Sequence, residues 1–275
     1  MEKEVTVVIP IYTVNLNRFE RFSLNTCFST LSKYDIVIIK PNSLDLSPLD
    51  SILHDKNFSV ESFDDSFFIG RKGYNKLMLS TIFYERFIGS RYILIYQTDV
   101  IVFKDDLYKW CSTGYDYIGA PWLPDKRGWL DKKFPYIIDW FLRYNISKIT
   151  PFFHSMKMKF KVGNGGLSLR KVSTFIQVLQ EHNSLAEFYW KHSTKPCYYE
   201  DVFWSKMAIN IPSYKEAAFF SWESHIPTAE YLTNGELPFG VHAFYKPKQK
   251  KYLLKYIDLD SVNEEGEIKN KSPKN

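Results

Sequence analysis

The stretch YILIYQTDVIVF, residues 92–103, combines buried apolar character with a candidate chemical group. Residues 92–96 are too few for a stable helix and are rich in β-branched and aromatic residues, which predicts a buried strand. Gln97, Thr98 and Asp99 interrupt the apolar run. A buried carboxylate is costly unless a cation or hydrogen bonds compensate it, and ligands in open α/β sheets bind at the carboxyl ends of strands. Asp99 is therefore a candidate site residue, and the alternative is a carboxylate that caps the next turn.

A second acidic candidate is the pair Glu200 and Asp201, which stands between two tyrosines and a Phe-Trp pair. Adjacent carboxylates in apolar surroundings tend to have raised and mutually split pKa values, as a general base requires. The alternative is an N-cap pair for a helix over residues 202–208, and the two roles are compatible.

Cations gather in the first turn of a helix predicted over residues 70–88. Its side chains and free backbone N–H groups suit an anion such as a diphosphate. Exposed lysines without a ligand are the alternative, although cations there oppose the helix dipole. The side chains concerned are Arg71, Lys72, Asn75 and Lys76.

Glycines cluster at Gly163, Gly165 and Gly166 around Asn164, which indicates positive φ angles or the close approach of a ligand to the backbone. A lone histidine, His242, lies between apolar neighbours in LPFGVHAF. Taken without context, such a histidine is more typical of a hydrogen-bonded core residue than of a ligand.

The surrounding pattern predicts an α/β fold. Hydrophobic strands are expected at residues 5–12, 35–41 and 58–63, with helices at 17–32 and 49–54 between them. This alternation implies a mainly parallel sheet with right-handed crossovers. No GxGxxG or GxxxxGK loop follows the first strand, so neither a dinucleotide site nor a P-loop is supported.

Composition and charge exclude several classes of protein. The net charge of +5 is modest and does not indicate a nucleic-acid binder, and three widely spaced cysteines make a disulfide framework or structural zinc site unexpected. We see no signal-peptide pattern and no apolar run near the ~20 residues that span a bilayer. We expect a cytoplasmic protein, or one at the inner face of the membrane.

Basic character is concentrated in residues 123–162, which hold nine Lys or Arg against three Asp, interleaved with aromatics. Such a segment suits a membrane surface or a phosphate-bearing acceptor. The alternative is an insertion that packs its aromatics and solvates its lysines. Residues 257–275 are expected to form a polar C-terminal tail.

Six motifs occur in an order that resembles the GT-A glycosyltransferases, and within them a bacterial family long labelled only as a domain of unknown function. They are VVIPIY (7–12), YQTDVIVF (96–103), YDYIGAPW (115–122), VGNGGLSLR (162–170), YEDVFW (199–204) and FGVHAF (239–244). The resemblance covers residues 5–245 and implies one GT-A-like domain over residues 1–256, with a mostly parallel central sheet flanked by helices.

The resemblance also implies a nucleotide-sugar donor, UDP-linked, a divalent metal, Mn²⁺ or Mg²⁺, and transfer to a hydroxyl of a glycan or lipid-linked acceptor. The metal motif of that fold is Asp-x-Asp, whereas here Gln97 replaces the first acid and leaves Asp99. Metal dependence is therefore in question. His242 lies where related enzymes supply a second ligand. The donor-binding residues implied are Pro10, Tyr12, Arg71, Lys72, Asn75, Lys76, Gln97, Thr98, Gly163, Asn164, Gly165 and Gly166.

In this interpretation Asp201 deprotonates the acceptor hydroxyl in an inverting displacement, and Glu200 orients the acceptor or caps the helix. The alternative is a catalytically inactive nucleotide-sugar or glycan-binding module on the same fold. A phosphatase or nuclease is disfavoured, because the clustered carboxylates of a two-metal site are missing.

Overall fold

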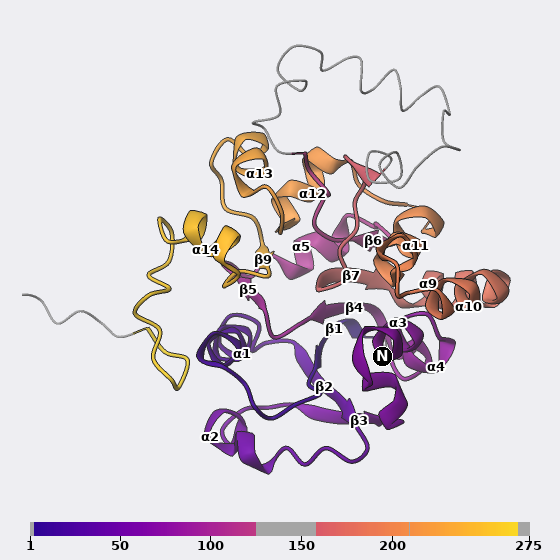
Figure 1. The fold of residues 1–275 in the computed structure, drawn as a ribbon, viewed down its shortest axis with the longest axis horizontal. Helices are drawn as coiled ribbons and strands as arrows, with labels where there is room; N and C mark the ends of the chain where they lie inside the picture. The colour runs from indigo at the N-terminus through magenta and orange to yellow at the C-terminus, as the bar shows by residue number, and fades with distance from the viewer. Residues whose placement is uncertain (1–2, 125–157, 209, 269–275) are drawn as a thin grey trace, which may run out of the picture.

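The computed structural model describes residues 3–124, 158–208 and 210–268, which form two sheets and their flanking helices (Figure 1). The larger sheet has six strands in the order β3-β2-β1-β4-β7-β6, and the smaller has three in the order β5-β9-β8. The strands are β1 Lys3–Pro10, β2 Asp35–Pro41, β3 Ser59–Phe63, β4 Ser90–Tyr96, β5 Val100–Val102, β6 Tyr117–Ile118, β7 Leu167–Lys171, β8 Ser221–Trp222 and β9 Gly240–His242.

The larger sheet is mostly parallel, as the sequence predicted. Strands β3, β2, β1 and β4 pair in parallel. Strand β7 is antiparallel to both β4 and β6, so of these six strands β7 alone runs in the opposite direction. The strand–helix alternation of the first third of the chain is confirmed.

Helices cover both faces of the larger sheet (Figure 1). In β1, Val7 and Ile9 pack into the core beneath α1, whereas Val8 belongs to the core beneath α3, α4 and α9. This alternation follows from the two-residue period of a strand. The helices are α1 Arg18–Thr30, α2 Asp50–Leu53, α3 Gly70–Met78, α4 Thr81–Glu85, α5 Leu107–Ser112, α9 Val172–Glu181, α10 Asn183–Lys191, α11 Glu200–Met207, α12 Tyr214–Phe220, α13 Ile226–Leu232 and α14 Pro247–Leu253.

The predicted helix over residues 70–88 is wrong as one element, because it is divided into α3 and α4. The break falls at Ser80, whose backbone is extended with φ −124° and ψ 142°. Two side chains satisfy carbonyls at the end of α3: Ser80 Oγ donates to Leu77 O at 2.8 Å, and Tyr84 OH donates to Met78 O at 3.0 Å. Side-chain hydrogen bonds of this kind are an alternative to continuing the helix.

The smaller sheet has a core of its own. Ile101, Trp222 and Val241 pack together there, and Leu259 and Val262 from the predicted polar tail are buried against them. Residues 257–268 are therefore packed on the domain, and residues 269–275 lie outside the described part. Residues 125–157 of the basic aromatic segment also lie outside it, so the expectation for that segment stays a prediction. No helix in the described ranges is long and apolar enough to cross a membrane.

Candidate functional site

Three of the predicted motifs meet where the chain passes from one sheet to the other. At the end of β4, Gln97 N donates to Gly166 O at 2.9 Å, which brings the glycine loop beside Gln97. In the smaller sheet, Val100 of β5 pairs with His242 of β9. Asp99 precedes Val100 directly, so strand register brings Asp99, His242 and Gly166 to one point.

Asp99 and His242 are in direct contact. Asp99 Oδ1 lies 3.0 Å from His242 Nε2, and both side chains are largely buried. Burial alone would raise the pKa of Asp99, but His242 and Lys246 hold it below its ordinary value. For His242, burial works toward a lower pKa, and the carboxylates of Asp99 and Glu223 raise it to about 10. Without a ligand, the imidazole is therefore a cation between two carboxylates.

Glu223 and Lys246 complete this group, and the sequence analysis missed both. Glu223 Oε1 lies 3.3 Å from His242 Nδ1, an ion-pair contact without the alignment of a hydrogen bond. Lys246 Nζ lies 3.7 Å from Asp99 Oδ2, and the lysine side chain is 55% exposed. Glu223 follows β8, which consists only of Ser221 and Trp222, so it lacks the long apolar run that marked Asp99 in the sequence.

The acidic pair lies in the first turn of α11 rather than at its N-cap, which is Tyr199. The fully buried Arg170 holds Glu200, with Arg170 Nη2 3.0 Å from Glu200 Oε1. Burial, followed by the charges of Glu200 and Glu223, raises the pKa of Asp201 to about 7. A carboxylate that exchanges a proton near neutral pH has the property of a general base.

The glycine loop owes its composition to close packing of protein groups. Gly163, Gly165 and Gly166 all have ordinary φ angles, and the positive φ, 71°, belongs to Asn164. A Cβ at Gly163 would lie 1.9 Å from the Trp122 ring, one at Gly165 would lie 1.9 Å from Glu200 Oε1, and one at Gly166 would lie 2.3 Å from His242 Nε2. Gly165 and Gly166 therefore leave space for two side chains of the site itself, Glu200 and His242.

Four other predicted donor-binding residues lie at or just beyond the carboxyl ends of β1 and β4. Pro10 ends β1, the strand beside β4, and Tyr12 follows with its side chain half exposed. Burial, together with the charges of Glu20 and Asp99, raises the pKa of Tyr12. Gln97 and Thr98 are partly buried in the crossover between the sheets.

The four predicted residues of α3 have different neighbours. Arg71 lies over the ring of Tyr199, and Lys72 and Lys76 lie 5.8 and 5.2 Å from the ring centroid of Trp190. Asn75 is buried, and its Oδ1 accepts from Glu200 N at 2.6 Å. Within the described part of the chain, none of the three cations forms a hydrogen bond or ion pair with Asp99, so their role in donor binding stays a prediction.

The donor set of Asp99 and His242 fits a divalent cation. Two neighbouring ligands on an octahedral cation, each about 2.1 Å away, are about 3 Å apart, and the two atoms here are 3.0 Å apart. Gly166 leaves space beside Nε2. In the described residues no group of three or more His, Cys, Asp or Glu could hold a metal, so any further ligands would come from substrate or water.

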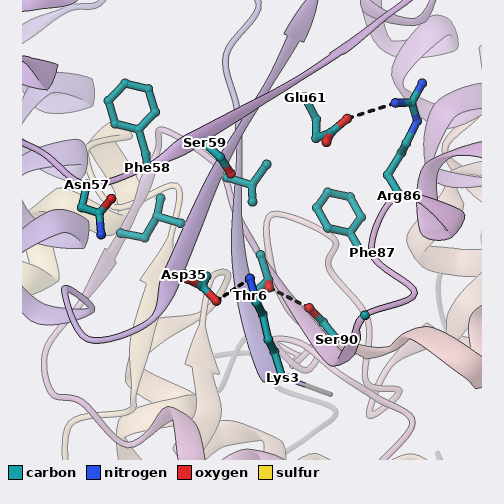
Figure 2. Close-up of a pocket in the computed structure, with 13 residues that line it drawn as sticks. Lys3, Thr6, Asp35, Asn57, Phe58, Ser59, Glu61, Arg86, Phe87 and Ser90 are labelled. Atoms are coloured by element: carbon teal, nitrogen blue, oxygen red, sulfur yellow. Dashed lines mark hydrogen bonds and ion pairs between the residues drawn. The ribbon is translucent and has the colours of Figure 1, made fainter. Parts of the chain in front are cut away.

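A cavity of about 380 Å³ lies at the opposite end of the strands of the larger sheet (Figure 2). It lies at the amino ends of β1, β2 and β4, away from the strand ends where ligands bind in such sheets. Its charged and polar groups pair with one another. The pairs are Lys3–Asp35 at 2.9 Å, Arg86–Glu61 at 3.2 Å and Thr6–Ser90 at 2.7 Å. We therefore assign the candidate site to the carboxyl ends of the strands, where Asp99 lies.

Known proteins resemble this chain in sequence and in fold. The family described as "Protein of unknown function (DUF5672)" matches residues 57–242, more than half of the chain. No curated protein sequence matches. The structure of a galactosyltransferase, LgtC, in complex with donor and acceptor sugar analogues is 11% identical, with a TM-score of 0.51 over 88% of this chain and 87% of that one.

Two further solved structures share the fold. Mouse xyloside xylosyltransferase 1 is 9% identical, with a TM-score of 0.50 over 87% of this chain and 97% of that one. The bifunctional glycosyltransferase WbbM is 13% identical, with a TM-score of 0.53 over 90% of this chain and 46% of that one. The chain has the GT-A fold, as the resemblance predicted.

The raised pKa of Asp201 predicts a pH-dependent cost in stability. Its ordinary value is 3.8 and its value in the folded protein is about 7. A carboxyl whose pKa rises on folding contributes stability below its unfolded pKa, and that contribution is lost as the pH rises through the folded value. Asp201→Asn should therefore raise the melting temperature more at pH 8 than at pH 5. Thermal unfolding at both pH values measures this, with Glu85→Gln as the control at an exposed carboxylate at the end of α4. An equal change at both pH values would contradict the raised pKa.

Proposed function

The chain belongs to the family described as "Protein of unknown function (DUF5672)", and we propose that it is a glycosyltransferase. It transfers a sugar from a nucleoside-diphosphate donor, UDP-linked, to a hydroxyl of a glycan or lipid-linked acceptor. One observation carries the proposal: Asp99 and His242, a pair suited to a divalent cation, lie at the crossover between the sheets, and Asp201 on α11 is a partly buried carboxylate whose pKa is raised to about 7. The fold shared with sugar-transferring enzymes supports it.

The donor diphosphate would bind on the Asp99 side of the site. A divalent cation, Mn²⁺ or Mg²⁺, held by Asp99 and His242 would neutralise charge on the departing diphosphate. Lys246, which lies 3.7 Å from Asp99, offers a second positive charge from the chain itself. Glu223 orients the His242 ring from its other nitrogen, as carboxylates commonly do for ligating histidines. Gln97 can accept or donate a hydrogen bond to the ribose without adding charge.

The acceptor would bind on the Asp201 side. Asp201 takes the proton of the acceptor hydroxyl, and the oxygen attacks the anomeric carbon as the bond to the diphosphate breaks. The bonding electrons leave with the nucleoside diphosphate. Because this is a single displacement at the anomeric carbon, the anomeric configuration is inverted. Glu200 has one oxygen, Oε2, that is buried and has no partner among the described residues, and this atom can accept a hydrogen bond from the acceptor. Contact with a membrane surface rests on residues 123–162 and stays a prediction.

Asp99→Ala should abolish sugar transfer while the protein still unfolds cooperatively. Loss of the carboxylate removes one of the two protein ligands and leaves His242 without its partner. Turnover is measured over a panel of nucleotide sugars, and thermal shift with Mn²⁺ and UDP should show stabilisation in the wild type that the variant lacks. Asp260→Ala, at a side chain that is 65% exposed, is the control. Full turnover in Asp99→Ala would contradict the proposal, and binding without turnover in the wild type would favour an inactive binding module.

Asp201→Asn should reduce kcat by about 10²- to 10⁴-fold, the usual contribution of a general base, and leave donor binding nearly unchanged. The amide keeps the volume of the side chain and removes its basicity. Steady-state kinetics with varied donor and acceptor separate these effects. If Asp201→Asn remains active while Glu200→Gln is inactive, the base is Glu200 and the assignment is wrong by one residue.

A further inference from the structure

Arg170 is a fully buried cation on β7 whose hydrogen bonds reach three parts of the site. Its Nη2 donates to Glu200 Oε1 at 3.0 Å and to Gly165 O at 3.5 Å. Its Nε donates to Ser168 Oγ at 2.9 Å, and Ser168 Oγ donates in turn to Gly165 O at 3.1 Å. The glycine loop and the first turn of α11 are thus joined through one guanidinium group.

The remaining donors of Arg170 point to the end of α3 and to α4. Nη1 donates to Tyr84 OH at 2.9 Å and lies 3.7 Å from Met78 Sδ. A guanidinium has five N–H groups, and these contacts provide a partner for each of them. The guanidinium is held by all of its nitrogen atoms, so its orientation has little freedom.

Glu200 is held through one carboxylate oxygen and its backbone N–H. The carboxylate meets Arg170 through Oε1, and the backbone N–H of Glu200 donates to Asn75 Oδ1 at 2.6 Å. A Cβ at Gly165 would lie 1.9 Å from Oε1, so the loop fits against this carboxylate. Glu200 and Asp201 are adjacent, yet among the described residues Arg170 forms an ion pair with Glu200 alone.

We propose that Arg170 is a positioning residue: it joins the glycine loop to α11 through Glu200 and neutralises that carboxylate, which leaves Asp201 as the group that receives the acceptor's proton. This inference rests on the proposed role of Asp201 as the base. Arg170 touches no reacting atom and acts through Glu200.

The charges that face Asp201 come from several elements. Glu200 is its neighbour on α11, Glu223 follows β8, Arg170 is on β7, and the Tyr117 hydroxyl faces it from β6. Glu200 and Glu223 favour the protonated form of Asp201, whereas Arg170 favours the ionised form. The two ends of the Arg170–Glu200 ion pair therefore act on Asp201 in opposite directions, and this opposition distinguishes a positioning role from simple support of the fold.

The experiment is a double-mutant cycle in the full chain that removes the charge of Glu200, of Arg170, or of both, and it has two readouts. The titration midpoint of the Asp201 carboxyl is followed by ¹³C NMR of aspartate-labelled protein, with the signal assigned by its absence in Asp201→Asn. The acid limb of kcat/KM against pH is measured in parallel. The variants are Glu200→Gln, Arg170→Met and the charge-neutral double variant. Lys206→Met on the exposed side of α11 is the matched control for loss of a cation.

Glu200→Gln should lower the Asp201 midpoint by about one pH unit or more, because a neighbouring like charge is removed. Arg170→Met should raise it, and the double variant should return it to near the wild-type value with turnover still reduced. Lys206→Met should leave both readouts unchanged. If Arg170→Met does not fold, Glu200→Gln and the double variant still decide the question.

Two outcomes separate the inference from the proposed function. If the Asp201 midpoint stays fixed across the cycle while turnover falls, Arg170 only supports the fold and the inference is wrong. If the midpoint moves as expected but Asp201→Asn keeps full activity, the proposed base is wrong and the electrostatic role of Arg170 still holds.

Discussion

The site depends on the three residues by which the chain crosses from one sheet to the other. Tyr96 ends β4 in the larger sheet and Val100 begins β5 in the smaller, so Gln97, Thr98 and Asp99 must lie in the seam between them. The strands that flank this seam bring the other groups to it: β7 begins just after the glycine loop, and β9 ends at His242. A polar break inside an apolar run is tolerated here because both sheets offer partners to its backbone and to its carboxylate.

The carboxylates of the candidate site differ in whether a cation is paired with them, and this difference suits them to different roles. Asp99 is paired with His242, and Glu200 with Arg170. Among the described residues Asp201 forms no ion pair, although it lies beside Glu200 and near Glu223. A partly buried carboxylate without an ion pair destabilises the fold when it is ionised, and a perturbed group of this kind is a candidate for chemistry. One side of the seam can hold a cation and a diphosphate, and the other can accept a proton.

Local signals predicted the strands and the mostly parallel sheet, and they pointed to Asp99 and Asp201 as candidates, because each of these depends on a few neighbouring residues. Contacts between distant segments could not be predicted in this way. In the sequence Arg170 looks like an ordinary residue at the end of a strand, and only the structure shows its bonds to Glu200 and Tyr84. A glycine is needed at position 163 because the Trp122 ring packs against it, not because a ligand does. The cations of α3 were expected to meet a diphosphate, but Lys72 and Lys76 lie over Trp190, which is more than a hundred residues away.

The central claim is direct displacement at the anomeric carbon with one carboxylate, Asp201, as the base. The most direct test is the anomeric configuration of the product, read from proton coupling constants by NMR early in the reaction with a donor of known configuration. A single displacement predicts that the product has the configuration opposite to that of the donor sugar. A product that keeps the donor's configuration would contradict the account, because one base-assisted displacement cannot retain it.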